Sequence, residues 1–103
     1  MNRSLYLDEN NKLKLAESIE IAIKKIKTLQ TLGKLVRENM INILENMRVC
    51  YCGKVYREFR PSKKDLRKLI EILIEIGKLE STSIEEYNYL EKLSTTVKVL
   101  LRD

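Results

Sequence analysis

Residues 15–50 read LAESIEIAIKKIKTLQTLGKLVRENMINILENMRVC, and the apolar pattern of this stretch decides the fold class. Small or apolar residues recur at alternating intervals of four and three, at Leu15, Ile19, Ala22, Ile26, Leu29, Gly33, Val36, Met40, Ile43, Met47 and Cys50. A repeat of about 3.5 residues places these side chains on one stripe of a helix, and here it lasts for about five heptads. The pattern therefore predicts an all-α helical bundle built on a long N-terminal helix at residues 10–48.

The length of such a helix has a consequence for assembly. It would extend about 60 Å at about 1.5 Å per residue, whereas a compact domain of about 100 residues has a radius of gyration near about 13 Å. A helix of that length cannot be covered by its own chain, so we expect a homodimer or a subunit of a larger complex. The predicted oligomer interface comprises Leu15, Ile19, Ile26, Leu29, Gly33, Val36, Met40, Ile43 and Met47.

Gly33 leaves a second architecture open, because glycine weakens a helix interior. A left-handed Gly33 would end a first helix and make residues 28–34 the corner of a helical hairpin. The unbroken heptad phase favours the continuous helix. The stripe is also wider than a coiled-coil seam, which is typical of helices that pack against several neighbours. The additional apolar positions are Ala16, Ile23, Leu32 and Leu44.

Two further helices are predicted at residues 62–77 and 83–102. Ser62 suits the N-cap position of the first, and Gly77 suits the residue that follows its C-cap. Ser83 is followed three residues later by Glu86, which is the spacing of a capping box at the start of the second helix. With the N-terminal element, these helices make residues 1–103 a single helical domain.

Residues 48–59, RVCYCGKVYREF, allow two local structures. Their Val, Tyr and Phe content is typical of strands, and Gly53 suits the first position of a two-residue hairpin turn. A short β-hairpin is one possibility. The other is that the preceding helix continues to about Cys52.

The composition argues against catalysis. The chain contains no His, which is the commonest general base and metal ligand. Cys50 and Cys52 supply two ligands where tetrahedral zinc needs four, and they are better explained as small hydrophobic residues. We expect no enzymatic activity, no catalytic residue, no metal site and no cofactor.

The hydropathy pattern predicts a cytoplasmic protein that does not enter a membrane. No run reaches the roughly 18 apolar residues of a membrane span. The first residues, MNRSLYLDE, lack the apolar core of a signal peptide. The abundance of Ile, Leu, Lys and Glu resembles thermophile usage, although an AT-rich genome would produce the same bias.

Positive charge is concentrated in the middle of the chain. Residues 49–68 contain seven basic and two acidic residues, a surplus that equals the net charge of +5 of the whole chain. Lys and Arg side chains neutralise phosphates, and the interleaved aromatic side chains could stack on unpaired bases. The predicted nucleic-acid-binding residues are Lys54, Tyr56, Arg57, Phe59, Arg60, Lys63, Lys64, Arg67 and Lys68.

The leading hypothesis is a small nucleic-acid-binding protein, or a small subunit of a nucleoprotein complex, that contacts the phosphate backbone largely without sequence specificity. The alternative is a protein–protein interaction module, such as an adaptor, an inhibitor or a structural component, with no nucleic-acid role. In that case the long apolar seam would be the functional surface. The sequence does not distinguish DNA from RNA.

Overall fold

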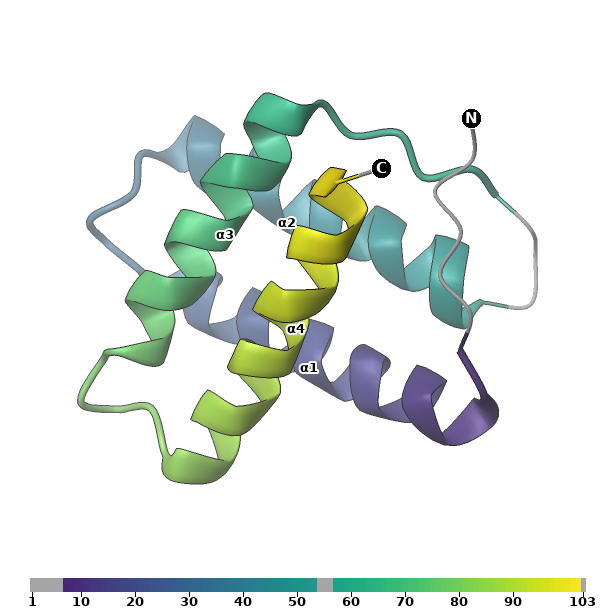
Figure 1. Ribbon diagram of the computed structural model, residues 1–103. Coiled ribbons are helices and arrows are strands. Elements are labelled where there is room, and N and C mark those ends of the chain that lie inside the picture. The colour runs from purple at the N-terminus through teal and green to yellow at the C-terminus, as the bar shows by residue number, and fades with distance from the viewer. Residues whose placement is uncertain (1–6, 54–56, 103) are drawn as a thin grey trace.

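The computed structural model describes residues 7–53 and 57–102 and confirms the all-α fold class. Its four helices are α1 (Glu9–Thr28), α2 (Lys34–Cys52), α3 (Lys63–Gly77) and α4 (Ile84–Arg102), and the described residues form no strand. They make a compact bundle in which α1 packs against α2 and α4, and α3 packs mainly against α4 (Figure 1). The Cα radius of gyration is 12.9 Å. No helix in the described ranges combines the length and apolar content needed to cross a membrane.

The prediction of a continuous helix over residues 10–48 is wrong, and the alternative of a helical hairpin is correct. Helix α1 ends at Thr28, and the chain reverses direction before α2 begins at Lys34 (Figure 1). Gly33 is the N-cap of α2, with φ −62° and ψ 152°. Its backbone is therefore extended, whereas the hairpin alternative expected a left-handed conformation. The heptad phase did not indicate continuity, because two antiparallel helices that face one core each need the same 3–4 spacing.

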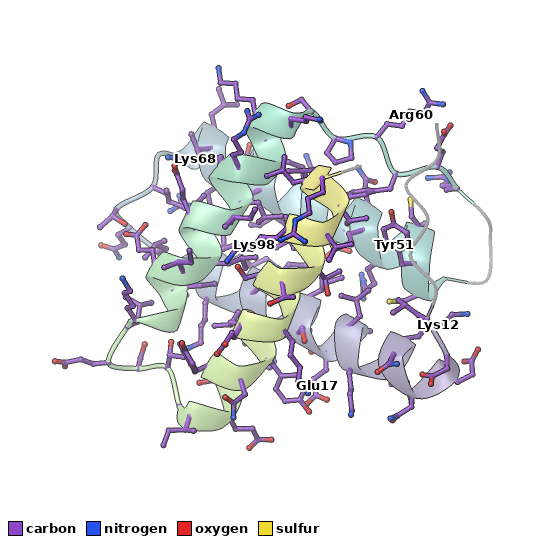
Figure 2. The ribbon with its side chains drawn as sticks, in the orientation of Figure 1. Lys12, Glu17, Tyr51, Arg60, Lys68 and Lys98 are labelled. Atoms are coloured by element: carbon purple, nitrogen blue, oxygen red, sulfur yellow. The ribbon has the colours of Figure 1, made fainter. Side chains whose placement is uncertain are left out.

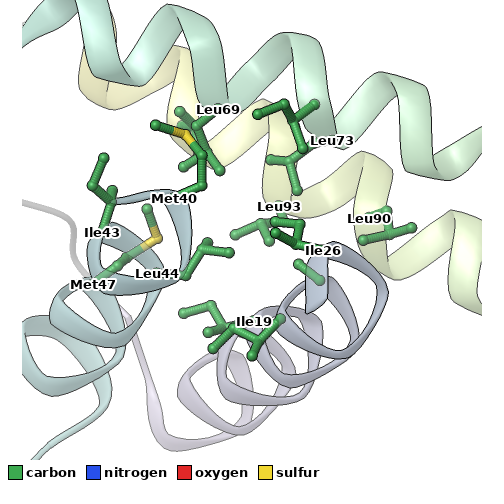
Figure 3. Packing of buried hydrophobic residues seen from close by; sticks show 14 of the residues in the cluster. Ile19, Ile26, Met40, Ile43, Leu44, Met47, Leu69, Leu73, Leu90 and Leu93 are labelled. Atoms are coloured by element: carbon green, nitrogen blue, oxygen red, sulfur yellow. The ribbon is translucent and has the colours of Figure 1, made fainter. Parts of the chain in front are cut away.

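The predicted seam forms much of the core of the single chain. Seven of the nine residues of the predicted oligomer interface are at most 7% exposed, namely Leu15, Ile19, Ile26, Leu29, Met40, Ile43 and Met47. They meet side chains of α3 and α4 such as Leu69, Leu73, Leu90 and Leu93 (Figure 3). Gly33 and Val36 remain exposed. In this structure the chain's own helices cover the seam, and a homodimer through any surface stays a prediction.

The starts of α3 and α4 agree with the sequence prediction. The Ser62 Oγ accepts a hydrogen bond from the N–H of Asp65 at 3.0 Å. In the capping box, the Ser83 N–H donates to Glu86 Oε1 at 2.9 Å and the Glu86 N–H donates to Ser83 Oγ at 3.1 Å. These bonds satisfy N–H groups that have no partner inside the helix.

The end of α3 differs in detail from the prediction. Gly77 is the last helical residue, and Lys78 follows as an ordinary right-handed C-cap. Gly77 does not adopt a positive φ. A Cβ at this position would lie 3.4 Å from the ring of Tyr87 on α4, which is an ordinary van der Waals contact, so the packing does not demand glycine here.

The β-hairpin over residues 48–59 is wrong within the described residues. Helix α2 continues to Cys52, with Gly53 as its C-cap, and residues 57–62 form neither helix nor strand. Residues 54–56 lie outside the described ranges. Packing overrides the local strand propensity, because the last turn of α2 places partly buried Tyr51 and Cys52 against the core. The Cys52 thiol also donates to the carbonyl oxygen of Lys12 at 3.4 Å.

Candidate nucleic-acid interface

The predicted basic residues lie along one edge of the bundle, on the connector before α3 and on the first two turns of that helix. We call this surface the basic edge. Its members are all exposed and comprise Arg57, Arg60, Lys63, Lys64, Arg67 and Lys68. Arg60 and Lys68 lie toward opposite ends of it (Figure 2). Lys54 and Tyr56, which were also predicted to bind nucleic acid, lie outside the described residues.

The amphipathic pattern of α3 directs its basic residues away from the core. Leu66, Leu69 and Leu73 are buried on one side of the helix. At about 3.6 residues per turn, the opposite side carries two rows of cations about 100° apart. One row contains Lys63 and Arg67, and the other contains Lys64 and Lys68.

Two of the six cations are paired with carboxylates of this chain. Arg60 forms an ion pair with Glu58, and Lys68 Nζ lies 3.7 Å from Glu71 Oε2. The hydrogen bond from Arg60 lowers the pKa of the Glu58 carboxyl, and the same bond raises the pKa of Arg60. Both side chains are exposed, so water screens this pair and its contribution to stability is small.

The other four cations form no ion pair within the described residues; they are Arg57, Lys63, Lys64 and Arg67. Asp65, the nearest acidic residue in the first turn of α3, accepts instead from the side-chain amide of Asn39 on α2 at 3.4 Å. The basic edge therefore presents several cations to solvent that an external anion can neutralise.

The described aromatic residues of this segment, Tyr51 and Phe59, do not present free ring faces for base stacking. Phe59 is only 5% exposed, and its ring meets that of Tyr51 edge to face, with centroids 5.6 Å apart and planes at 70°. Phe59 thus belongs to the core and anchors the connector to the end of α2. The sequence prediction placed Phe59 on the surface because it lies among basic residues. Its burial depends on contacts with the end of α2, which the local sequence does not show.

An open groove of about 850 Å³ between α2 and α3 was not predicted. Helix α2 contributes Leu35, Val36 and Met40 to its walls, and α3 contributes Lys64, Arg67 and Lys68. Three acidic residues also line it, namely Glu38, Asp65 and Glu71. Leu35 is 81% exposed and lies outside the heptad seam. An apolar residue at this position, beside Val36, was the only local sign in the sequence of an apolar groove.

The cysteines show no feature of a reactive or metal-binding site. Burial raises the pKa of both the Cys50 and the Cys52 thiols, which disfavours the nucleophilic thiolate. The described residues contain no group of three or more Cys, Asp or Glu side chains placed to hold a metal ion. The absence of catalysis stays a prediction.

The arrangement as a whole combines an exposed basic edge, carried by the connector and by the capped helix α3, with a neighbouring groove that has apolar residues on its α2 wall. Its exposed cations can attract anionic groups such as phosphates. No protein-family model matches the chain, and neither the curated proteins nor the solved structures contain a significant match to it.

Proposed function

We propose that the protein binds nucleic acid through the phosphate backbone, using the basic edge. The observation that carries this proposal is the exposure of six cations along one edge, four of them without a carboxylate partner among the described residues. Each phosphate neutralised by Lys or Arg releases condensed counterions, which favours binding. Phosphate contacts carry no base information, so the binding is independent of sequence.

The fold supports this proposal by fixing the backbone that carries the cations before binding. Ser62 caps α3, and buried Phe59 fixes the connector that carries Arg57 and Arg60. Groups that are already ordered lose less conformational entropy when a ligand binds. The basic edge should therefore bind as a preformed surface.

The decisive experiment measures the affinity for a labelled oligonucleotide against salt concentration by fluorescence anisotropy. If four to six phosphates are neutralised on a duplex, the logarithm of the binding constant should fall against the logarithm of salt with a slope of about −4 to −5. A flat slope, or no binding at low ionic strength, refutes the proposal.

A matched pair of variants locates the surface. Four unpaired cations of the basic edge are changed to Gln in the first, namely Arg57, Lys63, Lys64 and Arg67. Four exposed lysines elsewhere are changed to Gln in the second, namely Lys14, Lys27, Lys92 and Lys98. Both lose the same charge, so only the first should lose most of its affinity. Equal losses would show that binding follows net charge and not this surface.

The groove favours a second candidate function, a protein interaction or assembly module. The strongly exposed Leu35 and the adjacent Val36 give the groove an apolar lining. Amphipathic helices dock their apolar faces into grooves of this kind. Light scattering during size-exclusion chromatography, with and without oligonucleotide, separates the two candidates. A stable dimer that ignores DNA and RNA and dissociates on Leu35→Asp would favour the assembly function.

A further inference from the structure

We infer that the basic edge takes a B-form DNA duplex in preference to single strands and to an RNA duplex. This inference rests on the proposed function and names its ligand. Three features carry it: the two rows of cations on α3, the two exposed arginines on the connector before it, and the packing of the described aromatic rings, Tyr51 and Phe59, on each other.

The two rows match a ligand with two lines of phosphates. Lys63 and Arg67 lie one turn apart in one row, and Lys64 and Lys68 lie one turn apart in the other. The rows are about 100° apart on a helix about 10–12 Å across, so their extended charged ends lie about 10 Å from each other. The major groove of B-DNA is about 12 Å wide, admits an α-helix and is bordered by phosphates on both sides. A single strand has one line of phosphates and can satisfy one row at a time.

The position of α3 makes this contact accessible. Its buried face, with Leu66 and Leu69, packs into the core, while its N-terminal half forms an outer edge of the bundle (Figure 1). Exposed Arg57 and Arg60 precede the helix in the chain, and Arg60 lies beyond its start (Figure 2). They can reach phosphates that flank the segment of groove occupied by α3.

The aromatic side chains argue against a single strand as the preferred ligand. Proteins that bind single strands stack bases on exposed aromatic rings. The described aromatic residues beside the basic edge are Tyr51 and Phe59, and they pack on each other with Phe59 almost fully buried. An RNA duplex is also disfavoured, because the deep and narrow major groove of A-form RNA does not admit a helix.

Glu71 supplies a further consequence of this geometry. Its position lies between the angular directions of the two rows, one turn beyond Arg67, and its carboxylate is 3.7 Å from Lys68 Nζ. On a duplex this carboxylate would lie in the groove between the two lines of phosphates, where their negative potential opposes binding. Removing its charge should therefore strengthen the complex.

The test compares three probes of one sequence and equal length, namely single-stranded DNA, duplex DNA and duplex RNA, by anisotropy at the same salt concentration. Duplex DNA should bind at least about tenfold more tightly than either competitor, because both rows then contact phosphates. Equal or tighter binding of single-stranded DNA or of duplex RNA overturns this inference while leaving the proposed function in place. No binding of any probe overturns the proposed function itself.

Variants of the rows test the geometry directly. The double variant Lys63→Gln, Arg67→Gln and the double variant Lys64→Gln, Lys68→Gln should each reduce the affinity for duplex DNA more than the affinity for single-stranded DNA. Equal losses on both probes would contradict the arrangement of two rows across a groove.

The gain-of-affinity variant Glu71→Gln should bind duplex DNA about two- to fivefold more tightly, because one negative charge is removed from between the two lines of phosphates. Its matched control is Glu91→Gln, which removes the same charge from an exposed position on α4. If Glu71→Gln leaves the duplex affinity unchanged, or if the control gains as much, α3 does not face the phosphates as inferred.

Discussion

Replacing Gly33 by Asp or by Ala tests the turn that separates α1 from α2. In the structure Gly33 is the N-cap of α2, and its carbonyl oxygen accepts the N–H of Arg37 at 3.0 Å. A Cβ built on Gly33 meets no heavy atom within 4 Å, so either side chain fits without a clash. The backbone angles of Gly33 are also allowed for any residue.

The two substitutions should differ in stability because only Asp can cap the helix. Helix α2 has no side-chain cap and no acidic residue in its first turn. An Asp N-cap is worth about 1 kcal/mol more than Ala, within a range of about 0.5–2 kcal/mol. Its charge near the positive end of the helix adds about 0.3–1 kcal/mol. Gly33→Asp should therefore be about 1–2 kcal/mol more stable than Gly33→Ala, which corresponds to about 4–16 °C in melting temperature.

The measurement is urea and thermal unfolding of both variants, followed by far-ultraviolet circular dichroism at neutral pH. Both variants reduce the conformational entropy of the unfolded chain relative to glycine. Comparing Asp with Ala cancels this shared effect. If the helix instead ran through residue 33, Ala would be the better residue by about 0.5 kcal/mol. An order of stability with Ala at or above Asp would refute the hairpin.

The remaining predictions concern the core, the capping box and the thiols. Leu44→Ala removes a fully buried side chain and should lower the free energy of unfolding by about 2.7–5 kcal/mol. Leu35→Ala, at an exposed position on the same helix, should lower it by less than about 0.5 kcal/mol. Similar losses for the two variants in urea titrations would contradict the packing. The Ser83 N–H, with Lys25 nearby, lowers the pKa of Glu86, so its stabilisation should be full above the unfolded pKa of about 4.3 and disappear as the pH falls through the lower folded pKa. Glu86→Gln should flatten this part of the stability profile, and an unchanged profile would argue against the capping box. Because burial raises the pKa of Cys52, its alkylation by iodoacetamide should be much slower in the native protein than in urea; equal rates would show that the thiol is open to solvent.

The starts of α3 and α4 could be predicted because local chemistry decides them. Ser62 and the pair Ser83 and Glu86 satisfy helix N–H groups within three residues in sequence, and no distant contact is required. The turn before Gly33 could not be predicted in the same way. The heptad spacing is identical for one long helix and for two antiparallel helices that share a core.

The basic edge was predictable in its charge but not in its geometry. The surplus of Lys and Arg between residues 49 and 68 is visible in the sequence, and so is the polar side of α3. The burial of Phe59 against Tyr51 depends on how the connector returns across the end of α2. The groove that exposes Leu35 depends on the distance between α2 and α3, which are 11 or more residues apart in sequence.

The sequence by itself determined the all-α class, the apolar stripes, the N-terminal caps of the last two helices and the location of the positive charge, because each of these follows from residues within a few positions of one another. Only the tertiary structure decided that the apolar stripe over residues 15–50 folds back on itself, that it is covered within one chain, and that Phe59 faces inward. These outcomes depend on which distant helix covers each apolar face. That choice minimises the exposed apolar area of the whole chain, and no local pattern encodes it.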